Sequence, residues 1–266
     1  MIGVAASDLQ PPPYYSRQNS VFSQQLTVFC DFDGPIIDVS DRYYTTYKLG
    51  LADTQAAYKA EGIHLPIQML SKQQFWQMKQ DRVPDVEIAM RSGLHGEQIE
   101  FFLGRVIEIV NQPALLNLDK LQPGVRWALA LLHSQGVRLV LVTLRCQLQA
   151  TQILRYYGLT RLFSGIYGTC DRDAAYHNQA ELKTQLLEKA IAEQSQLASH
   201  PLSAWMVGDT EADILAGQSL SIPTIALTCG IRSQFYLKQF QPTRFHSDLL
   251  SATHYLLEST KPSRIS

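Results

Sequence analysis

The chain has 266 residues, of which 45% are hydrophobic and 18% are charged. This is enough apolar material for one large domain or two small ones, and it excludes global disorder. The 23 Lys and Arg residues against 24 Asp and Glu residues give a net charge of −1, so nucleic acid and acidic membrane surfaces are not expected partners.

The cysteines are few and widely spaced, with no C-x-x-C pair, which excludes a zinc ribbon and a dense disulfide framework. They are Cys30, Cys146, Cys170 and Cys229. No apolar run is long enough to span a membrane, and the amino terminus lacks the basic and hydrophobic regions of a secretory signal. We therefore expect a cytoplasmic protein.

The first predicted strand follows a segment without periodicity. Residues 1–25 carry three consecutive prolines among Ser, Gln and Asn, and we expect a disordered tail there. The apolar residues 26–30 then end abruptly in Asp31-Phe32-Asp33-Gly34. This pattern is typical of a buried strand that stops at a polar turn.

The next segment, residues 39–118, is too long for an ordinary connection and has a helical pattern. Tyrosines recur at helical spacing at positions 43, 44 and 47, and an apolar stripe runs from Ile99 to Val110. Between them, Ser71 and Gln74 form a capping-box pattern. We expect an inserted helical subdomain whose aromatic residues pack together. Its basic residues Lys79 and Arg82 either reach an anionic substrate or are solvated, and we expect solvation.

The remaining chain alternates strand and helix patterns. Apolar runs are at residues 137–143, 204–207 and 224–228, and helical patterns are at 123–133, 147–157, 180–194, 211–220 and 249–257. The sequence thus predicts an α/β fold, a Rossmann-like parallel sheet with helices on both faces and an inserted helical cap. The predicted parts are a core of residues 26–38 and 119–258, a cap of 39–118 and a tail of 259–266.

Polar residues follow the predicted strands: Asp31, Asp33, Thr143 and Asp209. Because the carboxyl ends of parallel strands form one crevice, these side chains should converge there. Carboxylates that meet in a crevice require a cation, and a set of oxygen ligands favours Mg²⁺ over softer metals.

These motifs resemble those of the haloacid dehalogenase-like hydrolase superfamily, particularly phosphatases with a helical cap after the first strand, such as phosphoglycolate phosphatases. The resemblance rests on the segments 31–34 and 208–213 and on Thr143 and Lys183. It implies that Asp31 is a nucleophile that forms an aspartyl phosphate and that Asp33 is the general acid and base. Dehalogenases of the family lack an acid at that second position.

Further site residues follow from the same resemblance. Thr143 and Lys183 would hold the transferring phosphoryl group, with Arg145 as an additional substrate contact. The expected magnesium ligands are Asp31, Asp33, Asp209 and Asp213. The substrate would be a small phosphorylated metabolite, and the protein a monomer or homodimer.

Several of these residues have simpler interpretations. Thr143 would then be an ordinary residue at a strand end, and Lys183 a solvated helical lysine. Asp213 is either a residue of the metal site or an aspartate favoured by the dipole in the first turn of a helix. After Thr143, this chain has Leu144-Arg145 in place of the small polar residue that is common in the family. Arg145 either binds phosphate or faces solvent. Pro35 replaces a common Thr and removes a backbone N–H.

The most strongly indicated function is magnesium-dependent hydrolysis of a phosphate monoester. One alternative is a phosphomutase of the same fold, which would pass the phosphoryl group to a sugar hydroxyl instead of water. Another is a protein that binds phosphate compounds without catalysis, for which Pro35 is the sequence argument. The presence of both Asp31 and Asp33 argues against the second alternative, because binding alone requires no acid beside a nucleophile.

Overall fold

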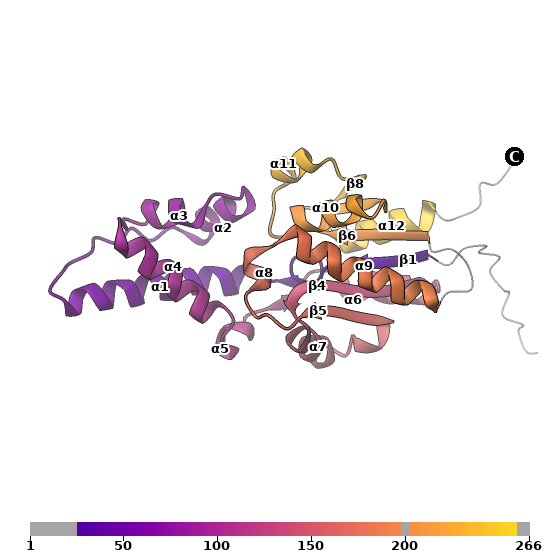
Figure 1. The fold of residues 1–266 in the computed structure, drawn as a ribbon, viewed down its shortest axis with the longest axis horizontal. Coiled ribbons are helices and arrows are strands. Elements are labelled where there is room, and N and C mark those ends of the chain that lie inside the picture. Colours follow the sequence, from indigo (N-terminus) through magenta and orange to yellow (C-terminus); the bar gives the residue numbers. More distant parts are fainter. Residues whose placement is uncertain (1–25, 198–202, 260–266) are drawn as a thin grey trace, which may run out of the picture.

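The computed structural model describes residues 26–197 and 203–259. At its centre is a six-stranded parallel sheet with the strand order β5-β4-β1-β6-β7-β8 (Figure 1). The strands are β1 (Leu26–Cys30), β4 (Arg138–Cys146), β5 (Gly165–Thr169), β6 (Ser203–Gly208), β7 (Thr224–Leu227) and β8 (Arg244–His246). The predicted tail of residues 1–25, and the predicted carboxyl-terminal tail beyond residue 259, lie outside the described residues.

Helices cover both faces of this sheet, because its strands carry apolar side chains on both sides. On β1, Val28 and Cys30 belong to one apolar cluster and Phe29 belongs to another. The first cluster includes residues of α6 (Val125–Ser134), α7 (Gln147–Tyr156) and α12 (Leu249–Ser259), and the second includes residues of α9 (Ala180–Gln196) and α10 (Glu211–Ser219). The predicted α/β class and its helices on both faces are confirmed.

The sequence missed some strands and one boundary. Strands β5 and β8 were not predicted, because one contains two glycines and the other has only three residues. Strand β4 continues to Cys146, past the expected end at Thr143, with an irregular register against β5 after Val142. Thr143 therefore lies inside the strand.

Residues between the first strand and α6 form helices that extend away from one end of the sheet (Figure 1). They are α1 (Ser40–Ala60), α2 (Lys72–Gln80), α3 (Asp85–Arg91), α4 (Glu97–Val110) and α5 (Pro113–Leu116). The predicted capping box opens α2, where Ser71 and Gln74 bond reciprocally. Tyr47 of α1 stacks on Phe75 with 4.8 Å between the ring centroids, so the aromatic residues pack as expected.

Two short antiparallel strands, β2 (Ile37–Asp38) and β3 (Lys120–Leu121), join this helical segment to the sheet. They bring the point where the chain leaves the sheet next to the point where it returns. The backbone N–H of Gln122 also donates to the carbonyl of Ile36 over 2.9 Å. Within the described ranges, none of the helices combines the length and the apolar character that a membrane crossing would need.

Candidate active site

The predicted site residues lie at the carboxyl end of the parallel sheet. Asp31 directly follows β1, and its N–H donates to the carbonyl of Val207 over 2.9 Å, which continues the pairing with β6. Asp209 directly follows β6. Because β1 and β6 are neighbours in the sheet, the side chains at their ends come together, as the sequence predicted.

Three buried carboxylates meet there: Asp31, Asp209 and Asp213 each offer one oxygen, and these oxygens lie within 4.8 Å of one another. One cation accompanies them, since Nζ of Lys183 lies 2.7 Å from Oδ1 of Asp31 and 2.7 Å from Oδ1 of Asp213. Lys183 is only 1% exposed, so it is not a solvated helical lysine. The group has three acidic side chains and one basic side chain.

The electrostatic consequence appears in the pKa values of these groups. Burial raises the pKa of Asp31 to about 7, although Lys183 opposes the change. Burial, together with the neighbouring charges of Asp31 and Asp213, raises the pKa of Asp209 well above its usual range. Burial alone would lower the pKa of Lys183, but the two carboxylates outweigh it and raise that pKa. Such a surplus of buried negative charge suits a cation.

The surroundings of Asp209 leave room for its carboxylate and little else. A Cβ atom on Gly34 or on Gly230 would lie 2.0 Å from Oδ2 of Asp209, and Gly34 has a φ of +99°. This oxygen accepts a hydrogen bond from the N–H of Ile231 over 2.5 Å, whereas Oδ1 of Asp209 is buried without a hydrogen-bond partner. This unpartnered carboxylate oxygen is the kind of ligand atom that a hard cation such as Mg²⁺ prefers.

Asp213 combines both of its predicted interpretations. It lies in the first turn of α10, and its Oδ2 accepts from the N–H groups of Asp209 and Thr210 and from Oγ1 of Thr210. These contacts form a capping box at the start of the helix. Its other oxygen faces Lys183 and the acidic group. The helix start therefore holds the carboxylate in place at the site.

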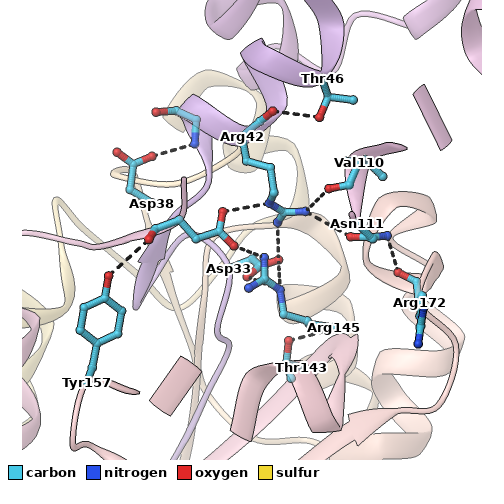
Figure 2. A network of polar contacts seen from close by, with 12 residues as sticks. Asp33, Asp38, Arg42, Thr46, Val110, Asn111, Thr143, Arg145, Tyr157 and Arg172 are labelled. Atoms are coloured by element: carbon cyan, nitrogen blue, oxygen red, sulfur yellow. Dashed lines mark hydrogen bonds and ion pairs between the residues drawn. The ribbon is translucent and has the colours of Figure 1, made fainter. Parts of the chain in front are cut away.

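Asp33 lies in a different environment, shown in Figure 2. Its carboxylate is 3.4 Å from Nη2 of Arg42 and 3.1 Å from Nε of Arg145. The same arginines contact Asp119, from Nε of Arg42 at 2.9 Å and from Nη2 of Arg145 at 2.6 Å. Two carboxylates and two guanidinium groups thus alternate in a buried network. The side chain of Asp33 is outside the group formed by the other three carboxylates, and its role as a magnesium ligand stays a prediction.

The network settles one alternative for Arg145. The expectation that it faces solvent is wrong, because the residue is 2% exposed and pairs with two carboxylates. Thr143, two residues earlier, is also buried, and its hydroxyl accepts from the N–H of Arg145 over 3.1 Å. Both side chains come from β4, the neighbour of β1 in the sheet.

Two members of this network, Arg42 and Asp119, were missed by the sequence. Arg42 lies on α1, where its position in a helical pattern indicates only a polar residue. Asp119 immediately precedes β3. They meet because β2 and β3 pair, and strands of two residues leave no recognisable pattern in the sequence.

Lys79 is a second correction. Solvation was expected, but the residue is 8% exposed and its Nζ lies 2.7 Å from Oδ1 of Asp85. Tyr176, on the short helix α8 (Ala174–His177), donates its hydroxyl to Oδ2 of the same aspartate over 2.5 Å. Arg82 is more exposed, and it pairs with Glu211 at the start of α10 over 3.2 Å. These contacts connect the helical segment to the sheet side of the site.

The chain is similar in sequence to curated phosphatases, over most of its length in one case and over about half of it in others. It is 26% identical to a phosphoglycolate phosphatase of Psychrobacter arcticus over 241 residues, which cover 89% of this chain and 97% of that protein. It is 31% identical to the pyrophosphatase PpaX of Halalkalibacterium halodurans over 119 residues, which are 45% of this chain and about half, 52%, of that relative.

A solved structure supports the fold. The structure of a HAD-superfamily hydrolase from Geobacter sulfurreducens superposes with a TM-score of 0.59 at 17% identity, over 89% of this chain and 100% of that one. The family model for haloacid dehalogenase-like hydrolases matches residues 28–227. That range contains both aspartates after β1, Lys183 and the acidic residues after β6. The chain therefore belongs to the haloacid dehalogenase-like hydrolase family.

Proposed function

We propose that the protein is a magnesium-dependent phosphatase that hydrolyses phosphate monoesters of small molecules through an aspartyl phosphate on Asp31. The observation that carries the proposal is the buried group of three carboxylates beside Lys183 at the carboxyl end of the sheet. The phosphatase and pyrophosphatase names of the relatives support the same reaction class.

Asp31, Asp209 and Asp213 would hold Mg²⁺, since their oxygens are close together, buried and accompanied by one lysine. When bound, the ion would offset the negative charge that accumulates as a carboxylate attacks a phosphate dianion. Oxygen ligands and a lack of soft donors among these three residues agree with this choice of metal.

The reaction would proceed in two displacements. A carboxylate oxygen of Asp31 forms a bond to phosphorus as the bond from phosphorus to the ester oxygen breaks, and Asp33 gives its proton to the departing oxygen to yield the alcohol. Asp33 then takes a proton from water as the water oxygen attacks phosphorus. The bond from phosphorus to Asp31 breaks, which releases phosphate and restores the carboxylate.

Thr143, Lys183 and Arg145 would contact the substrate from the core. Lys183 already bonds to Asp31, so its ammonium group would lie beside the phosphoryl group during attack. The hydroxyl of Thr143 lies on the strand next to β1. We propose that residues 39–118 act as a cap that closes over the alcohol part of the substrate, with the remaining described residues as the catalytic core. The four cysteines are unpaired, which agrees with a proposed location in the reducing cytoplasm.

The test is a screen of small phosphate monoesters for released inorganic phosphate, with Mg²⁺ and with a chelator. We expect turnover of at least one ester with Mg²⁺ and none with the chelator. Analysis of the products separates hydrolysis from the phosphomutase alternative, which would yield an isomeric sugar phosphate. If the folded protein binds phosphate esters but turns over none at any Mg²⁺ concentration, the non-catalytic alternative replaces the proposal.

A further inference from the structure

A small pocket lies in the helical segment, where that segment meets the core. It is lined by apolar side chains of α2, α3 and α4, including Phe75, Ile88 and Phe102, and by polar side chains. The polar side chains include Tyr43, Lys79, Asp85 and Tyr176, together with Thr46 and Tyr47. All of these except Tyr176 belong to the helical segment, and Tyr176 belongs to α8, which lies where the core faces α1 (Figure 1).

Two sets of contacts connect residues of the pocket to the proposed active site. Tyr43 directly follows Arg42, whose guanidinium contacts Asp33. On the other side, the backbone carbonyl of Lys79 accepts from Nη1 of Arg232 over 3.2 Å, and Nε of Arg232 bonds to Glu211, two residues after Asp209.

The charge of the pocket is balanced. Nζ of Lys79 lies 2.7 Å from Asp85 and within 6 Å of two aromatic rings, at 5.9 Å from the Tyr43 centroid and 5.2 Å from the Tyr176 centroid. Asp85 thus neutralises the lysine, and the hydroxyl of Tyr176 satisfies the other carboxylate oxygen. The buried cations beside the pocket, Arg42 and Arg232, are paired with carboxylates as well.

A second anionic group on a substrate would therefore meet no unpaired cation among the described residues of the pocket. It would have to lose its hydration and take Lys79 away from Asp85, which would leave that carboxylate buried and unpaired. An uncharged hydroxyl or alkyl group requires neither change. The cavity is small, about 20 Å³, which is room for about one water molecule, so small groups fit it best.

We propose that this pocket receives the alcohol part of the substrate and selects an uncharged one, and that Asp85 determines this selectivity because it neutralises Lys79. The inference rests on the proposed phosphatase function and adds the class of substrate. It also distinguishes this chain from its relatives named phosphoglycolate phosphatase, since the alcohol part of phosphoglycolate carries a carboxylate.

The test compares two esters of similar size, 2-hydroxyethyl phosphate and phosphoglycolate, which differ in a neutral hydroxymethyl group against a carboxylate. With Mg²⁺ present, we expect kcat/KM of the wild-type protein to be at least about tenfold higher for the neutral ester, the size of effect that one hydrogen bond to a charged group produces. A preference for phosphoglycolate would overturn this inference alone. Turnover of neither ester, nor of any other, would overturn the proposed function and this inference with it.

Variants that change the charge of the pocket make the test independent of the wild-type preference. Asp85→Asn leaves Lys79 unpaired and should shift the ratio of kcat/KM by at least about tenfold toward phosphoglycolate. Lys79→Gln leaves Asp85 unpaired and should shift the ratio the other way. A double variant with both changes restores neutrality, so its ratio should return toward that of the wild-type protein, which an unfolded pocket would not do.

A matched control is Asp53→Asn, which removes an ion pair with Arg105 elsewhere in the helical segment. Its ratio should equal that of the wild-type protein. If Asp85→Asn and Lys79→Gln shift the ratio in the same direction, or if neither moves it by more than Asp53→Asn does, the charge of this pocket does not select the substrate and the inference is wrong.

Discussion

Asp31 and Asp33 are two residues apart in the chain, yet their electrostatic environments differ. Asp31 belongs to a group with three carboxylates and one lysine, whereas Asp33 belongs to a network with two carboxylates and two arginines. The first group has more negative than positive side chains, whereas the second has equal numbers of both. Under the proposed function, the first environment calls for a metal ion beside the nucleophile, while the second holds the acid and base in place by protein groups alone.

The two environments also come from different parts of the molecule. The group around Asp31 is contributed by the sheet and by α9 and α10. The network around Asp33 includes Arg42 from the helical segment and Asp119 from the returning chain, so it depends on how that segment joins the core. A change in the position of the helical segment would alter the surroundings of Asp33 before those of Asp31.

The largest effect should follow Asp31→Asn. The amide carries no negative charge with which to attack phosphorus, so turnover should fall by more than about 10³-fold and no phosphoenzyme should form. Without Mg²⁺, the same variant should unfold at a higher temperature than the wild-type protein, because one charge leaves a group with surplus negative charge. Rapid acid quench with intact-protein mass spectrometry, together with thermal unfolding, measures both effects. A phosphoryl adduct on the variant would show that another residue is the nucleophile.

Asp33→Asn should have a different chemical effect and the opposite effect on stability. Attack on aryl phosphates should survive, since their leaving groups need little protonation, while hydrolysis of the intermediate slows by about 10²–10⁴-fold. A phosphoenzyme should therefore accumulate and map to the peptide that contains Asp31. Because the two arginines keep only Asp119, this variant should unfold at a lower temperature than the wild-type protein. Full steady-state activity would remove the acid and base role from Asp33.

Breaking the balanced network from its other side tests its contribution to stability. Arg42→Met leaves Asp33 and Asp119 with one guanidinium between them, and it should lower the free energy of unfolding by about 3–5 kcal/mol. Adding Asp119→Asn restores the charge balance and should recover part of the loss. The control Lys72→Met removes a half-exposed partner of Asp41 and should cost less than about 1 kcal/mol. Denaturant unfolding that gives equal losses for Arg42→Met and the control would contradict this account of the network.

The sequence could predict the first environment better than the second. Asp31 and Asp209 end neighbouring apolar strands, and the topology of a parallel sheet then places them together without further information. Arg42 and Asp119 meet through the pairing of β2 with β3, whose two-residue strands have no recognisable periodicity. The burial of Lys79 could not be predicted from the sequence either, because it depends on contacts with Asp85 and Tyr176, which lie on other helices. Contacts of this kind follow from tertiary packing and not from local pattern.

The smallest effect should follow Pro35→Thr, in the turn between the two aspartates and β2. The backbone hydrogen bonds of this turn are donated by Gly34, Ile36 and Ile37, so proline costs the turn no bond. Threonine would give the unfolded chain more freedom and should lower the free energy of unfolding by about 0.4–1 kcal/mol. It would also provide a free N–H in the turn that follows the nucleophile, as the family pattern does, so the rate should stay the same or rise. A fall in kcat of tenfold or more, about 1.4 kcal/mol of barrier, would show instead that the proline is required to shape this turn for catalysis.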